Sequence, residues 1–252
     1  MTKQLKTLAI GLDGARGGWV AAVLRGASVK PEDEGSWTAE LAPLKAIEDI
    51  QELRGGGGRR LKIAVDIPIG LPDRAELRSC DREARKRLGK LRSSVFAPPP
   101  RPILDAESFA DIQAWVEKVR STEPSAKGIS KQSFALFPKV REVDEWLCGD
   151  TARNKRLFEC HPELAFLHLN KGQPLPSKRS PAGAVQRLRL VSKKFGGAEQ
   201  RLRHFVSPGV DLSDALDAYA CLSVALRHRQ DESEELGGGE CDALGVPMRM
   251  VT

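Results

Sequence analysis

The chain opens with two apolar stretches separated by glycines. Thr7 to Asp13 and Trp19 to Leu24 are apolar, and three of the intervening residues are glycine. Apolar runs of this length joined by a glycine turn are typical of a β-hairpin. Trp37 to Leu41 has a similar texture. We therefore expect two hairpin strands followed by a third short strand.

The next apolar positions predict a helix and then a buried strand. From Leu44 to Leu53 they recur at three-residue intervals, which indicates one helical face. Leu61 to Ile69 is continuously aliphatic, as parallel strands buried on both faces are. A helix that returns the chain to a parallel neighbour makes a right-handed crossover. This crossover predicts Asp13 and Asp66 at the carboxyl edge of adjacent strands, where α/β sheets bind ligands.

The middle of the chain has a different pattern. Residues 71–154 are rich in Arg, Lys and Pro and carry helical spacing near 81–88, 108–120 and 130–147. We interpret them as a helical insertion in a single domain whose core comprises about 1–70 and 155–252. In the second part of the core we expect a strand at 156–160, helices beginning at Pro162, Pro181 and Asp211, and a strand at 248–251.

Composition places the protein among ordinary globular chains. Of the 252 residues, 40% are hydrophobic and 29% charged, whereas aromatic residues make up only 5%, which argues against a base-stacking sheet. No apolar stretch approaches the roughly 20 residues of a membrane span, so we expect a cytoplasmic protein without a membrane partner. The five cysteines form no CxxC pair, so we expect reduced thiols and no zinc site.

Positive charge is concentrated in two segments. Asp73 to Arg101 carries 9 basic and 4 acidic residues, and Lys155 to His204 carries 11 and 3. Such segments are often solvated helix faces, but a basic rim also attracts polyanions, which makes DNA or RNA the expected partner. Our candidate substrate-binding residues are Arg16, Arg85, Lys86, Lys131 and Lys178.

Acidic residues at strand ends and at a helix start are the strongest chemical signal. The candidate catalytic and metal-binding residues are Asp13, Asp66, Glu159 and Asp214. Converging carboxylates repel one another unless a cation neutralises them, and Mg²⁺ or Mn²⁺ prefers such oxygen ligands. Two such ions would activate a water and stabilise the leaving oxygen in phosphodiester hydrolysis. Glu163 and Asp217 remain alternatives to Glu159 and Asp214.

Two of the neighbouring residues need separate comment. Asp66 lies between Val65 and Ile67, where an unpaired carboxylate would cost several kcal/mol, so a metal or a cation such as Arg16 is expected beside it. His161 follows Glu159, but no HxxxH partner completes a zinc site. We expect His161 to be structural.

Eight motifs together resemble a known family. In chain order they are GLDGARGGWVAA, VDIPIGLP, CDREARKRLG, SSVFAPPPR, ISKQ, ECHPELAF, SDALDAYACLSVA and GVPMRMV. They resemble the ribonuclease-H-like nucleases grouped as domain of unknown function 429, over nearly the whole chain.

The resemblance implies an α/β fold with a mixed five-stranded sheet flanked by helices. It also implies acids on the first strand, at the end of the fourth strand and on the last helix. Asp13, Asp66 and Asp214 match these positions, and Glu159 is the fourth candidate. The implied function is a divalent-metal-dependent nuclease. Two alternatives remain open, namely a non-catalytic module that binds nucleic acid or a partner, and an ATP-dependent phosphotransferase of the actin and sugar-kinase type.

Overall fold

The chain forms two compact units. The computed structural model describes residues 5–56, 58–124, 126, 128–205 and 207–252. The first unit comprises residues 1–66, 151–234 and 251–252, and the second comprises 67–150 and 235–250. Residues 235–250 thus group with the helical middle, although we assigned them to the core. That the whole chain folds as a single domain stays a prediction.

A mixed five-stranded sheet forms the centre of the first unit. Its strand order is β3-β2-β1-β4-β5, with β3 and β1 antiparallel to β2, and with β4 parallel to both β1 and β5. The strands are β1 (Lys6–Ala15), β2 (Gly18–Gly26), β3 (Thr38–Leu44), β4 (Lys62–Val65) and β5 (Leu157–Glu159). The fold is therefore α/β with helices flanking a mixed sheet, as expected, and it is consistent with a ribonuclease-H-like fold.

The register of the parallel strands brings the predicted acids to one edge. Leu12 pairs with Val65, and Val65 pairs with Glu159. The N–H of Asp66 donates to the carbonyl of Leu12 at 3.1 Å. Asp13 and Asp66 consequently lie on neighbouring parallel strands at their carboxyl ends, which confirms the crossover prediction.

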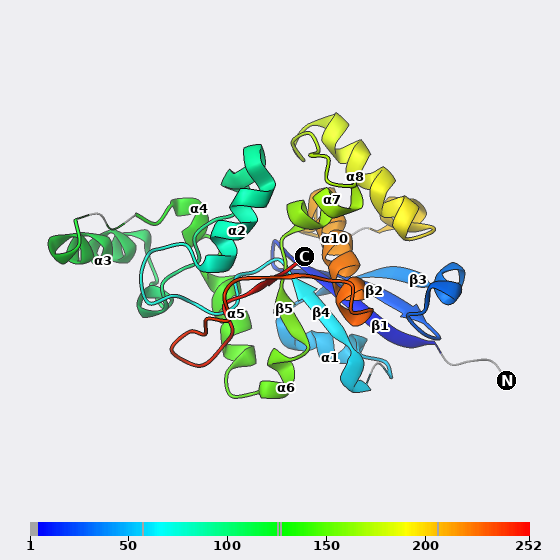
Figure 1. Cartoon of the computed structure of the whole chain (residues 1–252), viewed down its shortest axis with the longest axis horizontal. Helices are drawn as coiled ribbons and strands as arrows, with labels where there is room; N and C mark the ends of the chain where they lie inside the picture. The colour runs from blue at the N-terminus through cyan, green and yellow to red at the C-terminus, as the bar shows by residue number, and fades with distance from the viewer. Residues whose placement is uncertain (1–4, 57, 125, 127, 206) are drawn as a thin grey trace. The chain divides into compact units, whose positions relative to one another are not determined.

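Helix α10 (Leu212–Arg229) lies across one face of this sheet (Figure 1). The approach to β1 is close at Gly11, where an added Cβ would lie 2.0 Å from the Leu222 nitrogen and 2.2 Å from the Ala218 oxygen. Only glycine fits that contact. Twelve consecutive residues of α10, from Ala215 to Leu226, are buried, and this helix forms the main core together with the sheet.

The remaining elements divide between the units. The first unit also contains α1 (Ile50–Leu53), α6 (Thr151–Asn154), α7 (Pro162–Leu169), α8 (Pro181–Lys194) and α9 (Ala198–His204). The second contains α2 (Ser79–Leu88), α3 (Phe109–Thr122), α4 (Lys131–Phe134) and α5 (Phe137–Leu147). Strand β6 (Glu235–Leu236) pairs with β7 (Met250–Val251). No helix in the described part of the chain is both long enough and apolar enough to cross a membrane.

The bounds that the sequence predicted for three elements were wrong. The helix expected from Leu44 to Leu53 is shorter, because β3 continues through Leu44 and α1 has only four residues. The helix expected at 130–147 is two helices, because Pro138 has no N–H and is accommodated in the first turn of α5. The strand expected to reach Ile69 ends at Val65.

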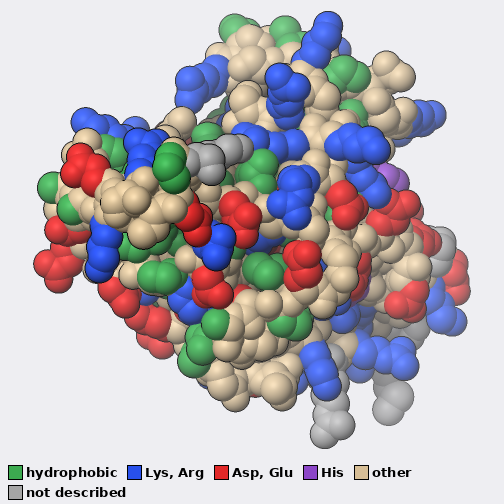
Figure 2. All heavy atoms as spheres, turned by 60° about the vertical axis from the view of Figure 1, so that its left-hand side comes forward, with side chains coloured by type: hydrophobic (Ala, Val, Ile, Leu, Met, Phe, Trp, Pro, Cys, Tyr) green, Lys and Arg blue, Asp and Glu red, His purple; other side chains and the backbone are tan. Residues whose placement is uncertain are grey.

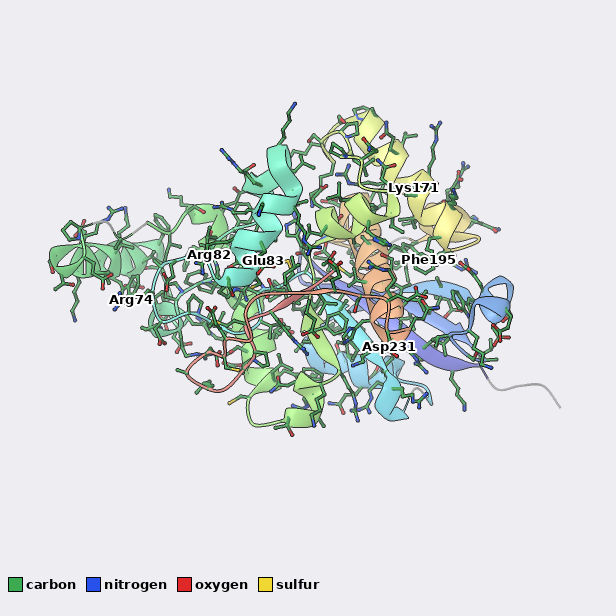
Figure 3. The ribbon with its side chains drawn as sticks, in the orientation of Figure 1. Arg74, Arg82, Glu83, Lys171, Phe195 and Asp231 are labelled. Carbon is green, nitrogen blue, oxygen red and sulfur yellow. The ribbon has the colours of Figure 1, made fainter. Side chains whose placement is uncertain are left out.

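Local turns hold the ends of these elements. The hairpin between β1 and β2 turns at Gly17, whose φ of 77° is readily adopted only by glycine. Lys171 after α7 and Asp231 after α10 are the non-glycine residues with positive φ among those described (Figure 3). Both follow the end of a helix, where a left-handed residue is a common way to terminate it.

Candidate acidic site

The site begins with Asp13 on β1 and Asp66 directly after β4. Asp13 is 9% exposed, and its Oδ1 accepts from the Gly14 N–H at 2.9 Å. Asp66 lies in the bend that ends β4, so it stands at the end of the strand and not inside it. The chain thus turns at the point where a charged residue replaces the aliphatic pattern.

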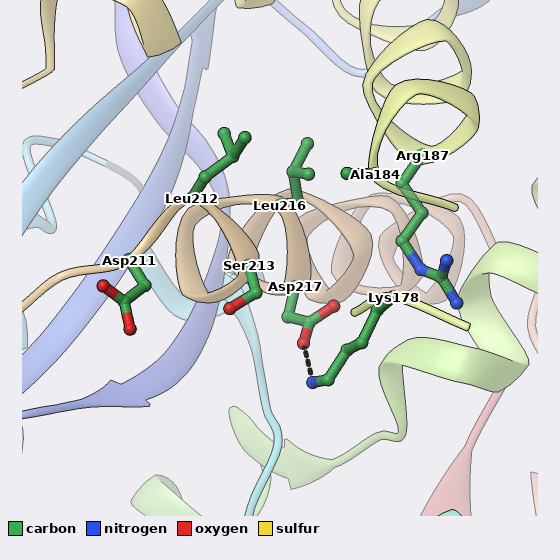
Figure 4. Close-up of a pocket in the computed structure, with 8 residues that line it drawn as sticks. All are labelled: Lys178, Ala184, Arg187, Asp211, Leu212, Ser213, Leu216 and Asp217. Carbon is green, nitrogen blue, oxygen red and sulfur yellow. Dashed lines mark hydrogen bonds and ion pairs between the residues drawn. The ribbon is translucent and has the colours of Figure 1, made fainter. Parts of the chain in front are cut away.

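Asp217 on the second turn of α10 is the third carboxylate. It is 1% exposed, and its Oδ2 accepts from the Lys178 ammonium at 2.6 Å. Its Oδ1 is buried and has no hydrogen-bond partner. Lys178 comes from the segment between α7 and α8, and Figure 4 shows it reaching Asp217.

The pKa values of these carboxylates show that their negative charges are under-compensated. Burial raises the pKa of Asp13 well above its usual value, and the neighbouring Asp66 and Asp217 raise it further. Burial raises the pKa of Asp66 to about 7 and that of Asp217 to about 6, against the opposing effect of Lys178. Each is normally near 3.8. The three acids therefore share one lysine as their countercharge.

The neighbouring carboxylates stabilise the charged form of Lys178. Burial by itself would lower the pKa of Lys178, but the charges of Asp217, Asp66 and Asp13 outweigh it and raise that pKa above its usual value. Lys178 is therefore a fixed positive charge throughout the physiological range. It was a sequence candidate for substrate binding, but in the structure it holds a carboxylate.

Glu163 and Arg187 form a second layer of charge beside the cluster. Arg187 on α8 donates to both carboxylate oxygens of Glu163 at 2.7 Å. Arg187 is 2% exposed, and its guanidinium also lies 5.2 Å from the centre of the Phe166 ring. Glu163, in the first turn of α7, nevertheless raises the pKa of Asp66 and Asp217 after the larger effects of burial and Lys178.

Glu159 is buried at the same sheet edge but on the other face. It pairs in register with Val65, whereas Asp66 and Cys160 each come one residue later. Successive strand residues point to opposite faces, so Glu159 is directed away from Asp13 and Asp66. Glu163, which we ranked below Glu159, lies nearer to the cluster.

Asp214 lies at the start of α10 and caps the helix. Its Oδ2 accepts from the Asp211 N–H at 2.9 Å, and it is half-buried. It is near enough to raise the pKa of Asp13 slightly, after burial and the larger effects of Asp66 and Asp217. The more deeply buried Asp217 occupies the place beside the other carboxylates that we assigned to Asp214. Which of these acids bind a metal stays a prediction.

The other sequence candidates are dispersed. Arg16 is exposed in the hairpin turn, where its N–H donates to Gly209. Arg85 and Lys86 lie on α2 and Lys131 begins α4, all in the second unit. Figure 2 shows Lys and Arg side chains at many points on the face drawn, with Asp and Glu between them. Their role in substrate binding stays a prediction.

His161 caps a helix, and Cys160 and Cys221 are buried. The Nδ1 of His161 accepts from the Glu163 N–H at 3.2 Å and so caps α7. Cys160 and Cys221 are buried near the acids, and burial raises the pKa of both thiols. A protonated, buried thiol is a poor nucleophile. All five cysteines are described and none forms a disulfide.

The sequence contained a usable signal for Asp217. Asp217 is an acid within the buried, mostly apolar run from Ala215 to Leu226, just as Asp66 lies within an aliphatic run of the sequence. An acid within an apolar helix requires a compensating partner, which gives it the same significance as Asp66. No comparable signal marked Lys178 as the partner of Asp217, because it lies in a segment already rich in basic residues.

The donor chemistry of the cluster fits a hard divalent cation. The carboxylates supply oxygen ligands, and the orphaned Asp217 Oδ1 is an acceptor without a donor. In the described part of the chain, no three His, Cys, Asp or Glu side chains are already gathered closely enough to hold a metal ion.

Comparison with known proteins identifies a family. No curated protein and no solved structure matches the chain. A sequence profile matches residues 11–240, a range that includes the acidic cluster, Lys178, Glu163 and Arg187. The chain therefore belongs to the family described as Protein of unknown function (DUF429).

Proposed function

We propose that the protein is a divalent-metal-dependent nuclease that hydrolyses phosphodiester bonds in nucleic acid at the cluster of Asp13, Asp66 and Asp217. The observation that carries the proposal is the convergence of three carboxylates from β1, β4 and α10 at the carboxyl edge of a mixed sheet. Ligand sites of open α/β sheets lie at this edge. The raised pKa values of the three carboxylates support a functional site, because residues with strongly shifted pKa values cluster at such sites.

Asp13, Asp66 and Asp217 are the residues that would hold the metal. When bound, Mg²⁺ or Mn²⁺ supplies the positive charge that activates water and stabilises the leaving oxygen. The protein's own part is to present carboxylates that are buried and mutually repulsive. A cation would relieve the repulsion among the three carboxylates. This cluster therefore favours metal binding more than a carboxylate already paired with a basic side chain does. Glu163, Glu159 and Asp214 remain further candidates for ligands.

Lys178 has a distinct role in this proposal. In the absence of metal its ammonium is the countercharge of Asp217, at 2.6 Å. If Asp217 held a divalent cation, the Lys178 ammonium would be repelled from that carboxylate, because like charges repel. Lys178 would then be available to contact a substrate phosphate.

A non-catalytic binding module is the second candidate, and a specific observation favours it. The Lys178–Asp217 ion pair already satisfies part of the cluster, and the described side chains hold no ready three-ligand site. In this reading Lys178 permanently replaces the cation, and the protein binds nucleic acid or a partner without metal. Removing Lys178 separates the two candidates.

Lys178→Met preserves much of the side chain's length and removes its charge. A nuclease site with a more negative cluster then binds Mn²⁺ at least as tightly as the wild type. If the protein is a binding module, the variant loses the countercharge that the three acids share and gains no stability from Mn²⁺. Thermal unfolding with and without millimolar Mn²⁺ distinguishes these outcomes.

Nuclease activity is tested with a panel of labelled oligonucleotides. Single-stranded and duplex DNA and RNA are incubated with Mg²⁺, Mn²⁺ or EDTA. We expect cleavage only with metal, and its loss in Asp66→Asn. Asp105→Asn is the matched control, because this aspartate has a 90% exposed side chain in the second unit. Absence of cleavage of every substrate by the wild type in both metals would contradict the proposal.

A further inference from the structure

A pocket next to the acidic cluster has one apolar wall and one polar end. It has a volume of about 320 Å³ and lies wholly within the first unit (Figure 4). Ala184 on α8 and Leu212 and Leu216 on α10 form the apolar wall. The polar end consists of Asp217, Lys178 and Arg187, with Asp211 and Ser213 completing the lining.

Two buried polar atoms that belong to the lining residues have no partner. They are the Oδ1 of Asp217, an acceptor, and the Nε–H of Arg187, a donor. Both side chains are almost entirely buried, at 1% and 2% exposure. Leaving a buried polar atom without a partner costs desolvation free energy, which a ligand with the complementary group recovers.

The other atoms of the same two side chains are already engaged. Arg187 donates to Glu163, to the Pro176 carbonyl at 2.8 Å and to the Gly183 carbonyl at 3.2 Å. Asp217 Oδ2 accepts from Lys178. These bonds hold the two side chains in place, so the orphaned acceptor and donor do not belong to mobile surface groups.

The apolar wall adds a second requirement. Leu212 lines the pocket and is 51% exposed, whereas Leu216 beside it is 2% exposed. A ligand that covers Leu212 gains hydrophobic contact as well as hydrogen bonds. The occupant is therefore a small group with an apolar face and an edge that carries both a donor and an acceptor.

Building on the proposed function, we propose that this pocket binds the unpaired base of a nucleic-acid substrate. Every nucleobase has an apolar face and an edge with a donor beside an acceptor. The volume is at the lower end for small-molecule sites, which suits a single base or nucleoside. Because Asp217 and Lys178 belong to both pocket and cluster, a base held here brings its own phosphate towards the carboxylates.

The proposal defines the class of substrate. Asp217 and Arg187 would bind the edge that pairs with the opposite base in a duplex, so that edge must be free. The substrate is therefore single-stranded, or it is a duplex from which a nucleotide is flipped out. Because each base supplies some donor and acceptor pair, we expect little selectivity among bases.

Nucleoside binding tests the pocket without metal and without phosphate. Adenosine, guanosine, cytidine and uridine are titrated separately into the protein in EDTA, and binding is followed by calorimetry and thermal shift. We expect millimolar or tighter binding to the wild type. Leu212→Ala should weaken it about tenfold, and Ala184→Phe, which fills the pocket from a partly exposed position, should abolish it. Val185→Ala is the control, because Val185 is 45% exposed on the same helix but does not line the pocket.

The same variants separate the failure of this inference from the failure of the nuclease proposal. If the wild type cleaves with metal, and folded Leu212→Ala and Ala184→Phe cleave single strands as well as it does, the pocket inference is overturned and the nuclease proposal stands. If nucleosides bind and these variants lose binding, but no metal-dependent cleavage occurs, the pocket stands as a nucleoside site and the nuclease proposal fails. No binding of any nucleoside to the wild type also overturns the inference.

Discussion

The buried carboxylates of Asp81 and Asp242 in the second unit have more hydrogen-bond partners than that of Asp217 in the first unit. In the second unit, Asp81 accepts from Arg78 through both oxygens at 2.7 and 3.0 Å and from the Arg78 N–H at 2.8 Å. Asp242 accepts from three backbone N–H groups and from Arg101. In the first unit, Asp217 keeps one oxygen unpartnered and shares one lysine with two other acids.

The difference separates a buried charge that is fully paired from one that is under-compensated. A carboxylate with all its acceptor positions filled stabilises a local fold and leaves no site for a ligand. A carboxylate that is buried, repelled by neighbours and partly unpartnered costs stability, and proteins retain such costs at functional sites. The comparison predicts opposite responses when the charge is removed.

The largest effect is expected from Asp81→Asn. This change leaves the Arg78 guanidinium, which is 1% exposed, without its charged partner. Breaking a buried ion pair in this way costs about 3–5 kcal/mol. Urea unfolding followed by circular dichroism should show that loss, whereas Asp105→Asn on the surface changes stability little. A loss below about 1 kcal/mol would mean that the pair is not structural.

Gly11→Ala tests the contact that places α10, and hence Asp217, against β1. A Cβ at this position would lie 2.0 Å from backbone of α10. We expect a loss of about 3 kcal/mol, the upper part of the overpacking range, together with weaker metal binding. Gly35→Ala is the matched control, because nothing lies within 4 Å of a Cβ there. Equal stability of the two variants would contradict the close packing of β1 and α10.

Asp66→Asn should respond in the opposite direction to Asp81→Asn. Removing one of several repelling carboxylates leaves the metal-free protein as stable as before, or more stable by about 1–2 kcal/mol at pH 7. The stabilisation by Mg²⁺ or Mn²⁺ should disappear. Unfolding in EDTA and in millimolar Mn²⁺ measures both quantities. A variant that is destabilised in EDTA as strongly as Asp81→Asn would remove the distinction between the two units.

The raised pKa values of the same carboxylates predict that stability depends on pH. The folded-state pKa values of Asp66 and Asp217, about 7 and about 6, lie above the value near 3.8 that carboxyls have when unfolded. Between pH 4 and pH 7 the folded state therefore binds more protons, so stability is greatest below this window and is lost as pH rises through it. The slope should flatten in the Asp66→Asn, Asp217→Asn double variant. Unchanged slopes would contradict the raised pKa values.

The sequence predicted the strands of the sheet more completely than the residues of the acidic site. The aliphatic runs and the glycine turn located β1, β2 and β4, and the crossover rule placed Asp13 beside Asp66. The end of β4 at Val65 was missed because the aliphatic pattern continues to Ile69 although the chain bends at Asp66.

The choice between neighbouring acids depended on details that a pattern does not contain. Glu159 is level with Val65 and therefore one residue before the position of Asp66, so its side chain lies on the opposite face of the sheet. One turn of helix separates Asp214, which caps α10, from Asp217, which faces Asp13. Lys178 is brought to the cluster by the segment between two helices, and such a tertiary contact has no periodic signature.

Manganese binding tests the central claim most directly. Crystals of the wild type, grown without metal and soaked in millimolar Mn²⁺, are measured for anomalous scattering. The account predicts an anomalous peak in contact with carboxylate oxygens of Asp13, Asp66 and Asp217, with the Lys178 ammonium displaced from Asp217, and no peak in Asp66→Asn crystals. A Lys178–Asp217 ion pair that stays intact in Mn²⁺, with no peak at these carboxylates, would contradict it.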